Sequence, residues 1–288
     1  MTSVLFEVDL AGGRAHKHYT KLLEPIAGNL DERFDWDALD PADYDPELVE
    51  QGRIGWTENA FNEFCTATAM GQLVETMGRA NVPIDLWGLA SSFPLEELLH
   101  VELCSRVAMR LGGGAPILYD PADLVLDFEP GLTPLQQCNE LIVRLCCVGE
   151  VFSLPMLAGS MQAATNPLTE AVLTQIVKDE AMHGKLGWMY MDWIGPSLDE
   201  AERARLAAAA ADTAGGLERI WERLRVDPEQ VARASASPPL EPTQRRSDMG
   251  WMDTRAYLAR SRHALEHEVF GRLAEYGIVV DRPTPPDR

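Results

Sequence analysis

Two short motifs of glutamate and histidine constrain most strongly how this chain can fold. The first is Glu97-Leu-Leu-His100 and the second is Glu180-Ala-Met-His183. Both lie in segments with helical patterning, where residues three apart leave the same face of the helix. Each motif therefore presents a carboxylate and an imidazole together on a face that is otherwise apolar.

Two further glutamates are spaced so that they can join these motifs. Glu63 precedes Glu97 by 34 residues, and Glu150 precedes Glu180 by 30 residues. Across an antiparallel helical hairpin, such separations place each lone glutamate roughly level with a Glu-x-x-His motif. One glutamate from each of two helices and a Glu-x-x-His from each of two others form the ligand set of a dinuclear carboxylate site in a bundle core.

The surroundings of these glutamates indicate a metal. Glu150 lies in the apolar stretch 145–156, and an unpaired carboxylate removed from water costs several kcal/mol. Four carboxylates sharing one core require cations between them. Four glutamates and two neutral histidines suit iron or manganese better than zinc, which is usually bound by four ligands.

The region 53–195 is predicted to contain four helices. Pro94 is expected to break or kink the second helix, and Pro155 to bend the third. A link without helical periodicity, 115–133, separates the first pair of helices from the second pair. A long link of this kind is typical of a four-helix bundle with one crossover. The predicted helices are 57–80, beginning at Thr57 as a capping residue, 84–112, 134–164 and 168–194.

The two flanks are predicted to differ from each other. Residues 1–52 are expected to form an irregular, acidic N-terminal extension with a short strand at 4–9. Residues 196–288 are expected to form a C-terminal helical extension that packs on the bundle. Its last helix has an apolar face that must be covered, which suggests a homodimer. This extension contains predicted helices at 199–225 and 253–277, a linker at 235–250, and the apolar face Leu265, Val269, Leu273 and Ile278.

From about residue 55 to 195, the chain resembles the ferritin-like di-iron carboxylate superfamily. The stretch 178–188 is especially similar to the Asp-Glu-x-x-His signature of its fourth helix. The resemblance implies an all-α, ferritin-like bundle with two iron ions, manganese being possible, and O2 as co-substrate. It also implies that Glu97 and Glu180 are the bridging ligands, the other two glutamates are terminal or shifting, and the histidines are nitrogen ligands. The matching residues are Glu63, Glu97, His100, Glu150, Glu180 and His183.

This resemblance predicts an O2-activating oxidoreductase, a monooxygenase or an oxidase, that acts on a small organic substrate, in specialised metabolism for example. Because the chain has no flavin or rubredoxin motif, an external electron donor or reductase is expected. Two alternatives remain open, a ferroxidase or iron-handling protein, and a non-catalytic helical interaction module with a vestigial metal site. The formal charge of −20 makes a tRNA-modifying activity improbable.

Three neighbouring residues are open to two interpretations each. Asp179 is either an acceptor for a ligand histidine or a solvated surface residue. Tyr190, two turns after His183, is either an oxidisable residue near the metals or a packing residue. Glu96 cannot share the helix face of Glu97, and it is expected to be solvated or paired with a partner.

Small residues near the ligands are also open to two interpretations. Cys104 and Cys146 lie one helical turn from predicted ligands, and they serve either as packing residues or as thiolate ligands. Gly149, Gly184 and Gly187 interrupt predicted helices, either for close packing or to leave space for a substrate.

Composition limits the location and partners of the chain. A charge of −20 and a pI of about 4.6 disfavour nucleic acid and anionic membrane surfaces. No signal peptide is recognisable, and no apolar run is expected to approach the roughly 20 residues of a membrane helix. The five cysteines form no C-x-x-C pair and are interpreted as reduced thiols. A cytoplasmic protein is therefore expected.

Overall fold

The computed structural model describes residues 3–8, 12–223 and 246–281, with 219–223 described for the backbone only. The described chain is mostly helical, as the sequence predicted. Its α-helices are α1 (Gly13–Ala27), α2 (Leu30–Arg33), α3 (Pro46–Arg79), α4 (Ile84–Ala90), α5 (Phe93–Arg110), α6 (Pro134–Leu141), α7 (Val151–Ala163), α8 (Pro167–Ile194), α9 (Glu200–Arg223), α11 (Thr254–His263) and α12 (Gly271–Glu275). The π-helical segments are η4 (Ile142–Glu150) and η7 (Ala264–Phe270), the 3-10 turns are η1 (Trp36–Ala38), η2 (Pro41–Asp43), η3 (Pro121–Leu124), η5 (Gly195–Ser197) and η6 (Ser247–Met249), and the strands are β1 (Val4–Phe6) and β2 (Ile117–Tyr119).

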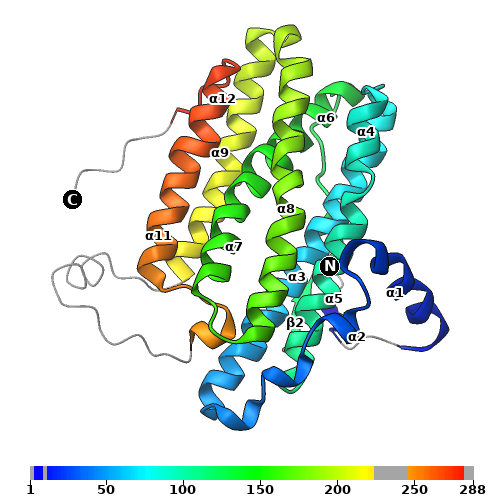
Figure 1. Ribbon diagram of the computed structural model, residues 1–288. Helices are drawn as coiled ribbons and strands as arrows, with labels where there is room; N and C mark the ends of the chain where they lie inside the picture. The colour runs from blue at the N-terminus through cyan, green and yellow to red at the C-terminus, as the bar shows by residue number, and fades with distance from the viewer. Residues whose placement is uncertain (1–2, 9–11, 224–245, 282–288) are drawn as a thin grey trace, which may run out of the picture.

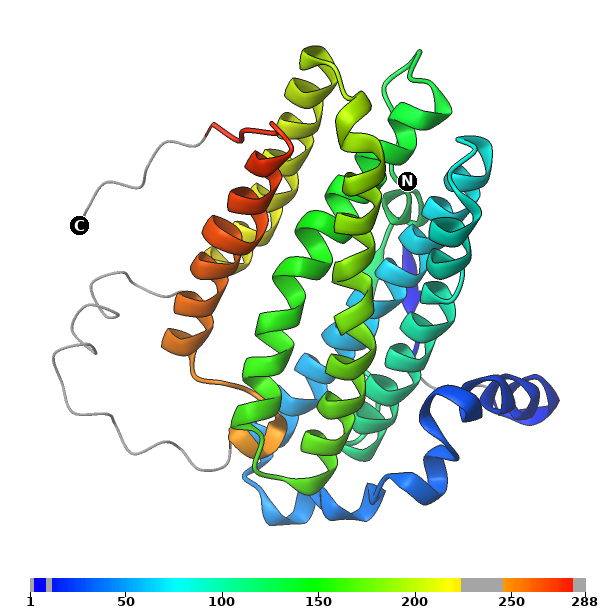
Figure 2. The ribbon, with the colours of Figure 1, turned by 45° about the horizontal axis from the view of Figure 1, so that its top comes forward.

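Four long helical runs surround the centre of the molecule (Figures 1 and 2). α3 packs along α5, α5 contacts α8, and α8 packs along η4 and α7. The ring closes because η4 and α6 contact α3. We call α3, α5, α8 and the continuous run α6–η4–α7 the helical core. These runs correspond to the four helices that the sequence predicted between 53 and 195.

The first core helix begins earlier than predicted. Thr57 was expected to cap it, but α3 starts at Pro46, which follows Asp45 and occupies the first turn. Proline suits this position because its missing N–H has no helical partner there. The hydroxyl of Thr57 instead donates to the backbone oxygen of Arg53 and accepts from the backbone N–H of Ala115. Thr57 therefore ties α3 to the link that follows α5.

The third core helix contains an irregularity that the sequence did not predict. The run begins at Pro134 with a capping box between Thr133 and Gln136. It then becomes π-helical over Ile142–Glu150 before continuing as α7. π-Helical turns are rare and occur frequently at functional sites. Here the π-helical segment ends at Glu150 itself.

The prediction that residues 1–52 are irregular was wrong in part. α1 occupies Gly13–Ala27 and buries Leu23 and Ala27, and it contacts α5. The predicted short strand is present as β1, which pairs antiparallel with β2 from the link after α5. α1 lies at the opposite side of the helical core from α11 and α12 (Figure 1).

The C-terminal extension packs on the helical core. α9 contacts η4, and α11 and η7 contact α7. The apolar face that suggested a homodimer is buried within the chain itself, so that face gives no reason to expect a dimer. Most of the predicted linker 235–250 and the tail from 282 lie outside the described residues. The buried residues of this face are Leu265, Val269, Leu273 and Ile278.

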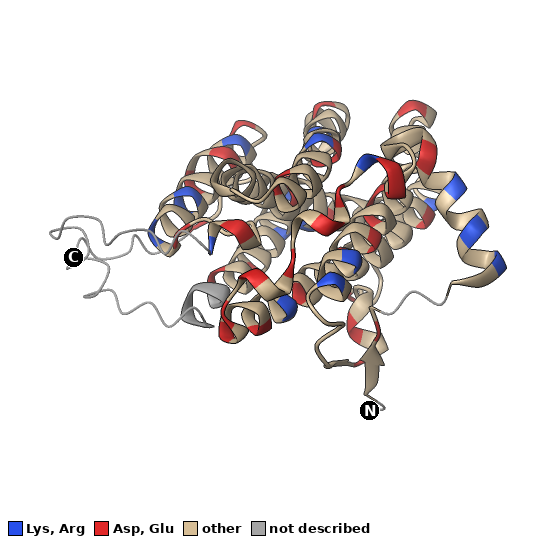
Figure 3. Cartoon of the chain, turned by 60° about the horizontal axis from the view of Figure 1, so that its bottom comes forward, with Lys and Arg blue, Asp and Glu red and all other residues tan. Residues whose placement is uncertain are grey.

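One described helical run, Pro134–Ala163, is long and apolar enough to cross a membrane by length and composition. This differs from the expectation that no apolar run approaches this length. In its most apolar window, 56% of the residues are buried within the molecule. A mostly buried core helix passes the same test, and this run carries Glu150 and contacts α3, α8 and α9. Acidic residues, shown in red, are distributed over many of the helices (Figure 3).

Close packing explains one glycine of α8. A Cβ at Gly187 would lie 2.9 Å from Sγ of Cys147 and 3.0 Å from the backbone carbon of Cys146, both in η4. We expect Gly187→Ala to lower the free energy of unfolding by about 1 kcal/mol or more, because backbone atoms cannot yield to the added methyl group. Urea unfolding of the purified variant measures this change.

Gly71→Ala is the matched control, because a Cβ at this helical glycine of α3 meets no atom within 4 Å. It should raise the free energy of unfolding by up to about 1 kcal/mol. Equal stabilisation by both substitutions would contradict the close approach of α8 and η4.

Candidate metal centre

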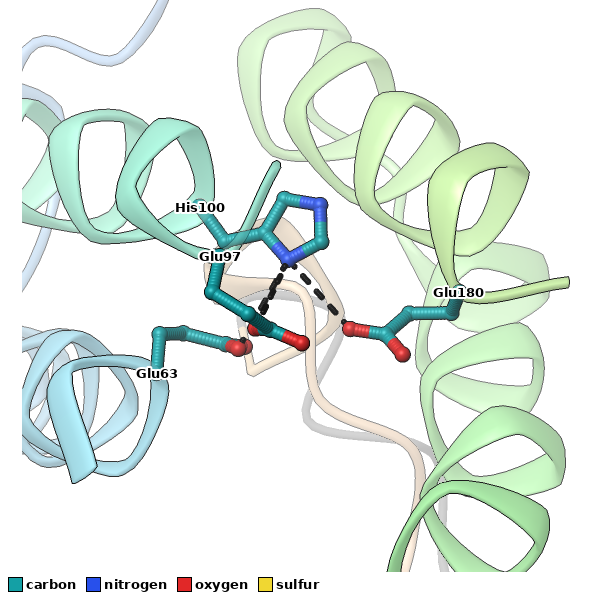
Figure 4. A group of neighbouring side chains, drawn as sticks. All are labelled: Glu63, Glu97, His100 and Glu180. Atoms are coloured by element: carbon teal, nitrogen blue, oxygen red, sulfur yellow. Dashed lines mark ion pairs between the residues drawn. The ribbon is translucent and has the colours of Figure 1, made fainter. Parts of the chain in front are cut away.

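The structure brings all six predicted ligands together in the middle of the helical core. α3 supplies Glu63 and η4 supplies Glu150, while α5 and α8 each supply one Glu-x-x-His motif. Figure 4 shows four of these side chains converging on one point, with His100 directed between the carboxylates. Glu97, His100 and His183 are completely buried.

The six side chains form two overlapping groups. Within each group, one ligand atom from each residue lies within 4.8 Å of the others. Ligands on opposite sides of a small divalent ion are about 4 Å apart, because each metal–ligand bond is about 2.1 Å. Each group is therefore close to the size that one ion requires. The first group is Glu63, Glu97, His100 and Glu180, and the second is Glu97, Glu150, Glu180 and His183.

Glu97 and Glu180 belong to both groups. Each has two carboxylate oxygens, so one side chain can contribute an oxygen to each group. Oε2 of Glu97 lies 3.4 Å from Nδ1 of His100, while its Oε1 lies 3.0 Å from Nδ1 of His183. Oε1 and Oε2 of Glu180 divide in the same way, at 3.3 Å from Nδ1 of His100 and 3.2 Å from Nδ1 of His183. Either carboxylate could therefore contribute one oxygen to each group.

Both imidazoles are oriented in the same manner. Nδ1 of each ring faces the carboxylates, and Nε2 faces a further acidic residue outside the cluster. Nε2 of His100 lies 3.4 Å from Oδ2 of Asp179, and Nε2 of His183 lies 2.9 Å from Oε2 of Glu96. An Nε2–H that donates to a carboxylate leaves Nδ1 with a lone pair, which is the form that binds metals.

Asp179 and Glu96, which we call the outer acids, each contact the histidine of the other helix. Asp179 precedes the motif on α8 but contacts the histidine of α5, and Glu96 precedes the motif on α5 but contacts the histidine of α8. Asp179 thus has the geometry predicted for an acceptor. Glu96 lies off the face of Glu97, as expected, and it is paired with a partner, which is His183 because α8 packs against that flank of α5. The shared pattern of acid, Glu, x, x, His in both helices is the signal that could have identified Glu96.

Burial disturbs the titration of the carboxyl groups. Burial raises the pKa of Glu63 to about 8. Burial, together with the charges of Glu180 and Glu97, raises the pKa of Glu150 well above its ordinary value. Burial lowers the pKa of His183, but interactions with Glu180, Glu96 and Glu97 outweigh it and raise this pKa to about 12. Without a metal, the cluster therefore retains protons that a cation would replace.

Three atoms at the centre have no hydrogen bond within the described part of the chain. They are both carboxylate oxygens of Glu97 and Nδ1 of His100. They lie close to charged partners, but without the geometry of a hydrogen bond. An unsatisfied buried polar atom costs about 1–3 kcal/mol, and more when it is charged. All three face the shared interior of the cluster, so a cation there would satisfy them together.

The structure does not bring Tyr190 into this cluster. Its hydroxyl donates to Oδ1 of Asn139 at 2.8 Å, and Nδ2 of Asn139 donates to Oε1 of Glu202 at 2.8 Å. These bonds join α8, α6 and α9. Tyr190 thus has the hydrogen bond of a buried packing residue.

The buried cysteines near the site are protonated thiols. Burial, and then the charge of Glu63, raises the pKa of Cys104 well above its ordinary value. Burial and the charge of Glu150 do the same for the pKa of Cys146. Neither cysteine belongs to the two groups of ligand atoms found among the described residues, and both are buried as packing residues. Phe93, which the sequence did not single out, covers His183 with a ring-centroid separation of 4.1 Å.

Comparisons with protein-family models, with curated proteins and with solved structures found no match for this chain.

The outer acids should control metal affinity. Asp179→Asn and Glu96→Gln each keep the side-chain shape but weaken the acceptor that orients a histidine. We expect each variant to bind Fe(II) about 10- to 100-fold more weakly. Anaerobic competition against a chromophoric chelator measures the affinity. Glu170→Gln, at an exposed position of α8, is the control, and a loss as large in that variant would contradict the proposed role.

The metal-free protein should show the cost of burying Glu63. Its pKa of about 8 in the folded protein lies above its ordinary value of 4.5, so the folded state holds this proton more tightly. The resulting stabilisation is complete below pH 4.5 and is lost as the pH rises towards 8. Glu63→Gln carries no such proton. In EDTA, the free energy of unfolding of the wild type should therefore fall relative to that of Glu63→Gln between pH 5 and pH 8, and parallel pH profiles would contradict this assignment.

Proposed function

We propose that the protein binds two metal ions, iron with manganese as the alternative, and uses them as an O2-dependent oxidoreductase. One observation carries this proposal, the pair of buried four-residue groups that share Glu97 and Glu180. The ring of α3, α5, α8 and α6–η4–α7 supports a ferritin-like four-helix bundle as the scaffold. Its link after α5 takes the place of the long crossover.

The described residues provide what such a site needs. Glu63, Glu97, His100 and Glu180 would hold one ion, and Glu97, Glu150, Glu180 and His183 the other. An iron pair, when bound, supplies the redox chemistry that reduces O2 and oxidises a substrate. The protein contributes position and dryness, since five of the six side chains are buried.

The sixth ligand differs from the other five. The side chain of Glu63 is 14% exposed, whereas those of Glu97 and Glu180 are 0% and 3% exposed. A carboxylate with solvent on one side can change its position at little desolvation cost. Glu63 thus marks the side of the cluster that can admit a small molecule. Asp179 and Glu96 would keep the imidazoles of His100 and His183 in one orientation.

The remaining partners follow from the chemistry. Reduction of O2 consumes electrons, so the protein would need an external electron donor as well as a small organic substrate. A cytoplasmic location agrees with reduced thiols, and the five cysteines are all free in the structure.

The shared ligands lead to a test based on metal stoichiometry. Wild-type protein loaded anaerobically with Fe(II) should retain about two ions per chain by elemental analysis. Glu63→Ala and Glu150→Ala should each retain about one, because each residue belongs to a single group. Glu97→Ala should lose both. Glu75→Ala, at an exposed position of α3, should retain two, and an unloaded wild type would overturn the proposal.

Exposure to O2 distinguishes an oxygenase or oxidase from a protein that only stores iron. The wild type loaded with two irons should give a transient absorption band that is absent from Glu150→Ala. After the band has decayed, the soluble wild-type protein should still contain two irons per chain. Continued uptake of added Fe(II) into a mineral, with many ions per chain, would favour iron handling instead. The optical spectrum and the iron content after gel filtration separate these outcomes.

A further inference from the structure

A cavity of about 510 Å³ lies at one end of the cluster, between α3, α7, α8 and the segment that leads into α11. Its walls are mostly apolar and include Trp56, Met156, Leu157, Leu173, Trp251 and Tyr257. Cavities of roughly 300–1,000 Å³ with such walls are typical of small-molecule sites.

The C-terminal extension builds one wall of this cavity. Residues 249–252, Met249-Gly-Trp-Met252, lie against the helical core through contacts that only glycine permits. A Cβ at Gly55 of α3 would lie 2.6 Å from Cζ2 of Trp251, and one at Gly159 of α7 would lie 2.6 Å from Cε of Met252. The indole Nε1 of Trp56 donates to the backbone oxygen of Met249 at 3.1 Å. This wall is therefore fixed in place.

Gly250 forms the turn within residues 249–252. Its φ of +78° is in the left-handed region that favours glycine, and a Cβ there would lie 2.9 Å from Cδ1 of Leu173. The turn brings Trp251 over the cavity from the side opposite α8. Part of the extension that had no assigned role thus completes a binding site.

The cavity and the cluster share the same faces of three helices. Trp56 precedes Glu63 by seven residues on α3, Leu157 follows Glu150 by seven, and Leu173 precedes Glu180 by seven. Residues seven apart lie two turns apart on one face of a helix, about 10 Å along the axis.

Asn59, one turn from Glu63, lines the cavity on the side towards the cluster. The part of the cavity that Asn59 lines is therefore the part nearest to Glu63, whose side chain is 14% exposed.

The lining also indicates which chemical group is recognised. Trp251 and Tyr257 are partly exposed and offer flat faces on which an aromatic ring can stack, whereas Trp56 is buried. Arg246 is the only cation among the described lining residues, and its guanidinium lies 5.8 Å from the ring centroid of Trp251. A guanidinium held against an aromatic wall binds a carboxylate through two parallel hydrogen bonds. Glu58, the only described anion of the lining, is exposed on α3.

We infer that this cavity binds an aromatic molecule that carries one carboxylate, with the ring against Trp251 and Tyr257 and the carboxylate on Arg246. The inference that this molecule is the substrate rests on the proposed function. The inference that the cavity binds it does not depend on that function. The two can be tested apart because the cavity residues are not metal ligands.

The test uses the full-length, metal-free protein in EDTA and isothermal titration calorimetry. The probes are 2-naphthoate, 2-naphthamide and 2-(aminomethyl)naphthalene, which share one ring system and differ in charge. We expect the wild type to bind 2-naphthoate at least about tenfold more tightly than the other two probes. Arg246→Gln should remove this preference, because it lacks the charge that pairs with the carboxylate.

Two further variants make the result decisive. Ser160→Leu fills the cavity from α7 and should abolish binding of all three probes, with folding verified by circular dichroism. Arg255→Gln, an exposed position of α11 outside the cavity, should bind as the wild type does. No binding by wild type, unchanged binding by Ser160→Leu, or preference for the amine would each overturn the inference. Naphthoate binding by a protein that fails to load iron would leave this site standing and remove the proposed function.

Discussion

The repulsion among four buried carboxylates is the constraint on which the rest of this structure depends. Glu63, Glu97, Glu150 and Glu180 meet in a core that has little access to water, and two imidazoles compensate only part of their charge. Such an arrangement is unfavourable unless protons or cations occupy it. The four core helices must therefore be held together by packing elsewhere along their length, with an apolar cluster of buried residues on each side of the site.

The extensions contribute to that packing and extend the function. α9 and η7 contact the π-helical segment that ends at Glu150, and thereby help to bury an irregular part of the helix. Residues 249–252 close a cavity beside the cluster, where glycines at 55 and 159 allow a tryptophan and a methionine to approach. The same extension thus covers one side of the candidate metal centre and forms one wall of the cavity. A proposed catalytic role for the metals and a proposed binding role for the cavity are consistent with one another.

The contents of the candidate site could be predicted from the sequence because helical spacing is a local property. Three-residue spacing places the two members of each Glu-x-x-His motif on one face, and the interval between helices places the lone glutamates level with them. The crossed pairs of Asp179 with His100 and Glu96 with His183 depend on which flank of α5 packs on α8. The first pair agrees with one of two open interpretations of Asp179, and the second agrees with the expectation that Glu96 is solvated or paired, but the pattern of a single helix identified neither partner.

The sequence by itself determined the helical class, the positions of the main helices and the identity of the six converging side chains, because hydrophobic periodicity and ligand spacing are written along the chain. Only the tertiary structure decided the earlier start of α3, the helix within 1–52, the π-helical turn before Glu150 and the internal burial of the face around Leu265. Only the tertiary structure separated Tyr190 from the cluster and brought Trp251 to a cavity wall. The physical reason is that each of these features depends on contacts between residues far apart in sequence, and local pattern carries no information about them.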